Sequence, residues 1–303
     1  MPAFPAAEMD ALARAVPGRA GFYIRDLNTG LSHEYNADEP LPTASTIKVA
    51  CLIEVFRQTE AGRLSLDDRH RVPKNISTIG TGVLSWTQDD PELTVRDYCR
   101  LMMAVSDNVA TDTLHGLVGG GAPIDATMEN LGFHHTRFPM PIGVWHYLMD
   151  GITVEPSREN DARKQAGKLT GDGDRDLPFA SSLENNVASA RDLGRLMEML
   201  YNGEIVSPDA CAQMIEMMKK PKNPNRLRQF LKPEIEAARK NGGSGRIKAD
   251  CGIVFLPSGP LFIAALVTTD TREESEQGMH VIANVSRLAY EVLSPESVLY
   301  PED

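Results

Sequence analysis

Short apolar runs flank turn residues near both ends of the chain, and apolar positions follow helical spacing in between. Near the N-terminus, residues 22–24 and 31–35 flank an Asn-Thr-Gly turn, which predicts a β-hairpin. Near the C-terminus, apolar runs at 253–256 and 261–269 flank Pro-Ser-Gly-Pro and predict a second hairpin, and the spacing over 281–292 predicts a closing amphipathic helix. Strands from both ends of the chain therefore flank a helical middle.

The helical middle is marked by apolar spacing and by capping residues. From Thr46, apolar residues crowd almost every side of a helix that Gly62 ends, so this helix must be buried. Three further helices begin at a capping residue: Thr94 for the helix through Met103, Asp107 for the helix through Leu117, and Ser189 for the helix through Leu200. Residues 139–182 carry prolines, glycines and many charges without sustained periodicity, so we expect a long surface loop there.

The composition excludes several classes of protein. Of the 303 residues, 42% are apolar, which is enough to bury a core in one large domain or two modest ones. The net charge of −11 repels phosphate backbones and anionic lipids, so we expect no nucleic-acid partner. The longest apolar run, Leu261–Val267, has seven residues, whereas a membrane span needs about 20, so we expect no membrane association.

The N-terminus has no basic region followed by an apolar one, as a secretory signal would have. This predicts a cytoplasmic protein, or a periplasmic or secreted one if a signal has been removed. The four cysteines form no C-x-x-C pair, so we expect buried thiols: Cys51, Cys99, Cys211 and Cys251. The histidines lack metal-ligand spacing, so we expect neither a metal site nor a cofactor.

Lys48 is the unusual residue of the buried helix, because a buried ammonium loses solvation and must be neutralised or paired. Ser45 lies three positions earlier, so a helix that starts there places its hydroxyl on the same face as the Lys48 amine. This is a nucleophile beside a base whose pKa burial lowers. The alternative is a capping serine followed by a lysine that extends outward, and S-x-x-K alone is expected roughly once by chance in a chain of this length.

Ser106-Asp107-Asn108 forms a second cluster, in the break between two predicted helices. There, a hydroxyl and an amide could both point into a cleft. A structural alternative is that Asp107 simply caps the following helix. The two interpretations are compatible.

Ser45-Thr46-Ile47-Lys48 and Ser106-Asp107-Asn108 resemble the first two motifs of class A β-lactamases and penicillin-binding proteins. The separation of 61 residues between the two serines fits that family. The helix before Ser106, the helix after it and the loop of three glycines at 119–121 also resemble the segments that carry the second motif there. The resemblance covers roughly residues 21–293.

The third motif of this family, K-T-G, is best matched by Lys240-Asn241-Gly242, with asparagine in place of threonine. The resemblance implies that Lys240 provides positive potential for a substrate carboxylate, and that the following backbone pairs with the substrate as an added strand. The alternative is a helix over 234–240 that Asn241-Gly242 ends.

The resemblance implies an α/β fold of the β-lactamase/transpeptidase type, with an antiparallel sheet flanked by helices and an inserted all-helical domain. We expect the sheet domain to comprise residues 1–42 and 204–303, and the insertion to comprise 43–203 with the long loop 139–182. The order of strands, helices and strands agrees independently. The family often joins two helices by a disulfide near Cys51 and Cys99, but Cys51 is one residue out of position, so we expect no bond here.

The implied reaction is acyl transfer, in which Ser45 attacks a carbonyl, Lys48 takes its proton, Ser106 passes a proton to the leaving nitrogen, and Asn108, Lys240, Asn241 and Gly242 bind the substrate. Three hypotheses compete. They are a hydrolase of β-lactams, a cytosolic amidase, esterase or transacylase for another peptide-like substrate, and a non-enzymatic protein that traps acyl groups.

One part of the family's site is missing. After Thr136-Arg137-Phe138, where the family carries a glutamate that holds the deacylating water, this chain has Pro139-Met140-Pro141. The spacing selects no replacement among the nearby carboxylates: Asp172, Asp174, Asp176 and Glu184. We therefore expect weak deacylation.

Overall fold

The computed structural model describes residues 3–87, 89–173, 176–221 and 223–300. Its contacts divide the chain into Met1–Thr46 with Val187–Asp303, the sheet unit, and Ile47–Asn186, the helical unit. The sequence placed the boundaries at 42/43 and 203/204 instead. The second boundary differs because α8 (Ala190–Asn202) packs on strands of the sheet, so this helix belongs to the sheet unit.

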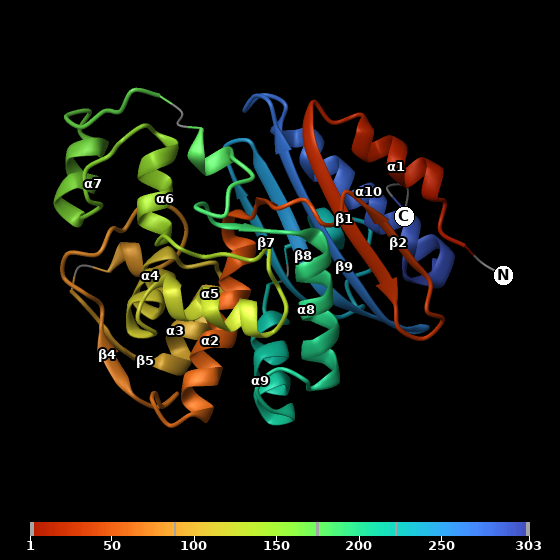
Figure 1. The fold of residues 1–303 in the computed structure, drawn as a ribbon, viewed down its shortest axis with the longest axis horizontal. Coiled ribbons are helices and arrows are strands. Elements are labelled where there is room, and N and C mark those ends of the chain that lie inside the picture. Colours follow the sequence, from red (N-terminus) through yellow and green to blue (C-terminus); the bar gives the residue numbers. More distant parts are fainter. Residues whose placement is uncertain (1–2, 88, 174–175, 222, 301–303) are drawn as a thin grey trace. The chain divides into compact units, whose positions relative to one another are not determined.

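The sheet unit is built on five antiparallel strands in the order β2-β1-β9-β8-β7 (Figure 1). Their bounds are Gly18–Asp26 (β1), Ser32–Tyr35 (β2), Ala237–Ser244 (β7), Ile247–Leu256 (β8) and Gly259–Thr269 (β9). Both predicted hairpins, β1–β2 and β8–β9, are confirmed. Because β1 pairs with β9, the two ends of the chain meet in the middle of one sheet.

Helices cover both faces of this sheet (Figure 1). Alternate residues of β1 point to opposite faces: Phe22 and Ile24 join the apolar core under α1 (Ala6–Arg14) and α10 (Ser275–Leu293), whereas the Tyr23 hydroxyl donates to Glu198 of α8. On α8, a Cβ at Gly194 would lie 2.1 Å from the Tyr23 ring, so glycine allows the helix to pack closely. α9 (Pro208–Met218) contacts α8 and β7.

Strand β7 lies at the edge of the sheet and carries the third motif. A helix ending at Asn241 is therefore wrong, because Lys240 pairs with Cys251 and Gly242 with Ala249 in a regular antiparallel ladder. Arg239 fixes the strand from one face through a fully buried ion pair with Asp250, with 2.7 Å between Nη1 and Oδ2. The free edge of β7 leaves alternate backbone N–H and C=O groups without a neighbouring strand.

The helical unit begins with the buried helix α2 (Lys48–Glu60), which contacts α3 (Val95–Ala104), α4 (Asn108–Leu117) and α5 (Gly121–Asn130). The predicted caps are confirmed, since Thr94 accepts the N–H of Asp97 and Asp107 accepts the N–H of Ala110. The remaining short elements are β3 (Leu41–Pro42), β4 (Arg69–Arg71), β5 (Glu92–Thr94), β6 (Val187–Ala188) and 3₁₀ turns at 44–47, 84–86, 177–179, 226–228 and 295–297.

The prediction of a long loop over 139–182 is wrong in part, because this region contains α6 (Ile142–Met149) and α7 (Arg158–Gln165). α7 is polar on every side, so the sequence shows no helical spacing of apolar residues there. Acidic residues in its first turn and basic residues in its last turn stabilise it through the helix dipole. The buried Asp161 of α7 ties the region down by accepting the Tyr147 hydroxyl at 2.6 Å and the Thr78 N–H at 2.6 Å. In the part of the chain that the structure describes, no helix is long and apolar enough to cross a membrane.

Candidate active site

Lys48 is the first residue of α2, and its side chain is fully buried. Its Nζ donates to the Ser106 carbonyl at 2.7 Å, to the Ser106 hydroxyl at 3.1 Å and to Asn108 Oδ1 at 2.8 Å. The structure thus brings together three of the predicted site residues within the helical unit, and the alternative of a lysine that extends to solvent is wrong.

Two opposing effects set the pKa of Lys48. Burial lowers it from the usual 10.5 to about 7, while the carboxylates of Asp112 and Asp107 act in the opposite direction. An amine with a pKa near 7 is present in both protonation states at neutral pH. It can therefore accept a proton and return it within one reaction cycle.

Ser106 and its neighbours are held by a loop that the sequence did not single out, residues 79–84. The Ser106 backbone has φ +56°, a left-handed conformation that is costly for a serine. Asp107 is fully buried and accepts the N–H groups of Val83 at 2.6 Å and Leu84 at 2.9 Å, so it both caps α4 and holds the loop. Thr81 donates its hydroxyl to the Ser106 carbonyl at 2.8 Å.

The amide of Asn108 is also fixed on both sides. Its Nδ2 donates to the Ile79 carbonyl at 3.1 Å and lies 3.4 Å from His146 Nε2 on α6. A Cβ at Gly80, where φ is +93°, would lie 2.2 Å from Nδ2. Glycine is therefore required at this position for the loop to pass over the amide.

Ser45 lies in the sheet unit, half-buried in the 3₁₀ turn Ala44–Ile47 that leads into α2. The preceding residue, Ala44, has φ +45°, so the backbone is strained at the entry to this turn. Gly242 of β7 packs directly on the turn, since a Cβ there would lie 2.6 Å from the Thr43 carbonyl oxygen and 2.7 Å from the Ser45 backbone nitrogen. The first and third motifs are thus in contact through backbone atoms.

Lys240 is buried on β7, and its Nζ donates to the Asn241 carbonyl at 2.7 Å. Asn241, at the position of the expected threonine, is half-buried on the same edge strand. Of the seven predicted site residues, four therefore lie in the sheet unit and three in the helical unit: Ser45, Lys240, Asn241 and Gly242, and Lys48, Ser106 and Asn108, respectively.

The structure adds three residues that the sequence analysis missed. The Arg226 side chain lies against β7, since a Cβ at Gly243 would be 2.6 Å from Arg226 Nη2. The buried Nε of Arg226 has no hydrogen-bond partner among the described residues. Asp112 of α4 accepts the N–H groups of Ile142 and Gly143, and burial raises its pKa to about 6. The third residue is His146. No spacing or motif marks these residues, because only tertiary contacts bring them beside the predicted site residues.

The described carboxylates that the sequence offered as candidates for the deacylation base are not buried. Asp172, Asp176 and Glu184 are all exposed, and Asp174 lies outside the described residues. The Asp172 backbone packs near the end of α6, where a Cβ at Gly151 would lie 2.7 Å from its nitrogen. For the three that the structure describes, no feature selects one as the base.

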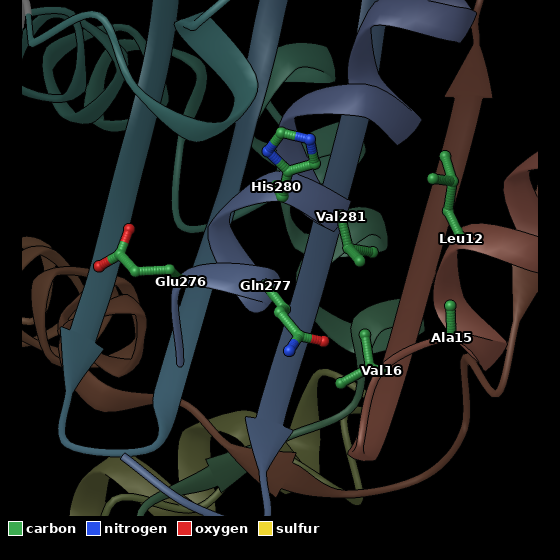
Figure 2. A pocket seen from close by; sticks show the side chains of 7 residues that line it. All are labelled: Leu12, Ala15, Val16, Glu276, Gln277, His280 and Val281. Atoms are coloured by element: carbon green, nitrogen blue, oxygen red, sulfur yellow. The ribbon is translucent and has the colours of Figure 1, made fainter. Parts of the chain in front are cut away.

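A cavity of about 350 Å³ lies elsewhere on the sheet unit, between α1 and α10 (Figure 2). Its walls are mainly apolar, with Leu12 and Val16 on the α1 side and Val281 on α10, and His280, Gln277 and Glu276 of α10 also line it. None of the predicted site residues lines it. The four cysteines are buried free thiols, and no group of metal-binding side chains occurs among the residues that the structure describes.

Comparison with known proteins supports the expected family and fold. The sequence profile of the Beta-lactamase enzyme family matches residues 5–293. A β-lactamase of Rhodobacter capsulatus is 24% identical over 279 residues, which are 91% of this chain and 83% of that protein. The structure of PBP-A superposes with a TM-score of 0.77 at 24% identity, covering 94% of both chains. A mutant of PBP-A, solved as an acyl-enzyme complex with penicillin G, has a TM-score of 0.75 at 25% identity and covers 93% of both chains.

The fold is therefore that of the β-lactamase/transpeptidase-like serine hydrolases. The chain belongs to the β-lactamase enzyme family, as a divergent member.

Proposed function

We propose that this protein is a serine hydrolase in which Ser45 is the nucleophile. Its Oγ attacks the carbonyl of a β-lactam or of a peptide-like amide or ester and becomes acylated. The observation that carries the proposal is the setting of Lys48, a fully buried amine hydrogen-bonded to Ser106 and Asn108 with a pKa lowered to about 7. The family match supports the choice of reaction, and the penicillin G acyl-enzyme of the PBP-A mutant supports the choice of substrate class.

In the proposed acylation, neutral Lys48 accepts the Ser45 hydroxyl proton as Oγ bonds to the carbonyl carbon. The carbonyl electron pair moves onto oxygen, where the Ser45 N–H and an outward N–H of β7 stabilise it, and it returns as the carbon–nitrogen bond breaks. The proton reaches the leaving nitrogen through the Ser106 hydroxyl, which accepts a hydrogen bond from Lys48. An ester on Ser45 and a free amine are the products.

We propose that the substrate lies along β7. The free edge of this strand offers backbone groups to an extended ligand. Lys240 and Arg226 add positive charge near Asn241 and Gly243, which suits a substrate that carries a carboxylate. This is the chemistry shared by β-lactams and peptide C-termini.

Hydrolysis of the ester is the slow step in this proposal. The chain has Pro139 after Arg137-Phe138, and the three described candidates for the deacylation base, Asp172, Asp176 and Glu184, are exposed. General base catalysis contributes about 10²–10⁴-fold, so loss of a positioned base costs about 3 to 5 kcal/mol of barrier, and the adduct should persist for minutes or longer.

Intact-protein mass spectrometry with a panel of β-lactams over time tests both parts. We expect a stoichiometric adduct on the wild type, little turnover, and no adduct on Ser45→Ala. A fluorescent penicillin or a fluorophosphonate that still labels Ser45→Ala would refute Ser45 as nucleophile. Rapid turnover without adduct would refute slow hydrolysis, and an absence of adduct and turnover with every β-lactam would favour another peptide-like substrate.

A further inference from the structure

The hydrogen bonds around Asn108 define how its amide is oriented. Oδ1 accepts from Lys48 Nζ at 2.8 Å, while Nδ2 faces the Ile79 carbonyl at 3.1 Å. The reverse orientation would set NH₂ against the Lys48 donor and oxygen against a carbonyl, so only one orientation satisfies the network. Nδ2 must therefore be a donor toward His146 as well.

This orientation fixes the state of His146. Its Nε2 lies 3.4 Å from Nδ2, an atom that can only donate, so Nε2 must accept and the proton of the neutral ring must be on Nδ1. Burial favours this neutral form, and so do the cations Lys48 and Lys164, whereas Asp150 opposes it; together they lower the pKa of His146 to about 4. The ring is thus an acceptor throughout the neutral pH range.

We propose that His146 is a positioning residue for the acyl transfer at Ser45: its neutral imidazole accepts an N–H of Asn108 and so holds Oδ1 of that amide toward the Lys48 amine. The effect of His146 on acylation rests on the proposed function. The hydrogen-bond chain Lys48–Asn108–His146 does not, because it lies wholly within the helical unit and can be tested without substrate.

The role is specific to an acceptor at this place. Gly80 brings no side chain against Asn108 Nδ2, and a Cβ at Gly80 would also lie 3.2 Å from His146 Nε2. The Thr81 hydroxyl of the same loop reaches the other end of the amide, donating to Oδ1 at 3.5 Å. Without an acceptor, one N–H of Asn108 loses its partner and the amide can rotate. Lys48 then loses a hydrogen bond that favours its charged form, so its pKa should fall.

The first test is NMR of the full-length protein labelled with ¹⁵N-histidine. We expect His146 Nε2 to remain unprotonated and Nδ1 protonated from pH 5 to 8. A protonated Nε2, or titration of His146 near 6.5, would overturn the proposal.

The second test compares His146→Leu, which removes the acceptor, with His146→Gln, whose amide oxygen can replace it. His134→Leu is the matched control, because His134 is exposed and contacts Glu129. In His146→Leu we expect the limiting rate of labelling by a fluorescent penicillin to fall about 10- to 100-fold, since small misplacements of catalytic groups have effects of this size. The midpoint of its pH profile should move to lower pH, and His146→Gln should recover both.

A merely structural role for His146 predicts a lower melting temperature with an unchanged midpoint, and this result would overturn the proposal. So would a His146→Gln variant as slow as His146→Leu. If no β-lactam labels the wild type, the pKa of Lys48 is read by NMR instead, and it must still fall in His146→Leu alone. If His146→Leu does not fold, the histidine spectrum of the wild type decides.

Discussion

Ser45 and Lys48 are three residues apart, yet different kinds of contact hold them. In the sheet unit, backbone atoms do the positioning: β7 lies against the Ser45 turn because Gly242 has no Cβ. In the helical unit, side-chain hydrogen bonds do it, around an amine whose pKa is lowered to about 7. Backbone packing depends on shape and does not change with pH. The side-chain hydrogen bonds depend on protonation, so substitutions in the helical unit should change the pH dependence of acylation, whereas those in the sheet unit should change only its rate.

The largest effect is expected for Lys48→Arg. A guanidinium cannot lose its proton in the working range of pH, so acylation should fall by about 10²–10⁴-fold, the usual contribution of general base catalysis. The measurement is the rate of adduct formation by mass spectrometry, with Lys220→Arg, at an exposed lysine, as the control. Near wild-type acylation by Lys48→Arg would remove Lys48 from the base role.

The second-largest loss of acylation rate is expected for Gly242→Ala, because the added methyl group is a steric change only. The new Cβ would meet three backbone atoms at 2.6 to 2.9 Å, so β7 and the Ser45 turn must separate. Because displacements near 1 Å can cost about 10²-fold, we expect a loss of this order with an unchanged pH midpoint. Gly116→Ala is the control, since a Cβ there meets nothing within 4 Å. A shifted midpoint in Gly242→Ala would contradict the division between the two units.

Arg226→Gln should affect binding rather than chemistry. Loss of a charged hydrogen bond to a substrate carboxylate costs about 1.5 kcal/mol or more, so half-saturation should require roughly tenfold more β-lactam, with little change in the limiting acylation rate. Arg226→Lys, which keeps the charge, should recover part of the loss. An equal loss with a substrate that lacks the carboxylate would show that Arg226 acts on the fold and not on the ligand.

The smallest effect is expected for Asp112→Asn. Acylation needs neutral Lys48, so it rises as pH increases through the pKa of this amine, about 7. The Asp112 carboxylate raises that pKa, so its removal should move the midpoint to lower pH without changing the plateau much. Asp125→Asn is the control, because its carboxyl is also partly buried but accepts the Phe138 N–H instead. A midpoint that moves upward would contradict the sign of this coupling.

Local signals predicted the hairpins, the buried helix and the capped helices, because apolar runs, turn residues and capping residues each act over a few positions. The same signals failed for α6 and α7, because both helices have only eight residues and α7 has no apolar face. They also misplaced α8, since helical spacing does not tell which surface a helix packs on. At the candidate site, Lys48 was predicted because a lysine in an apolar helix is unusual, and Ser106 and Asn108 were predicted because Ser106-Asp107-Asn108 lies between two helices and resembles the second motif of the family. Asp112, His146 and Arg226 were missed because only contacts between segments distant in the sequence bring them beside the predicted site residues.

The state of the cysteines has a practical consequence. Burial raises the pKa of each thiol, that of Cys99 to about 12 and that of Cys51 well above its usual range, so the thiolate that reacts with maleimides is suppressed at all four positions. The native cysteines should therefore not react with thiol-specific spectroscopic labels. Single cysteines introduced at exposed Glu8 of α1 and Glu159 of α7 would carry one probe on each unit, and spin-label distances between them would measure how the two units are arranged in solution.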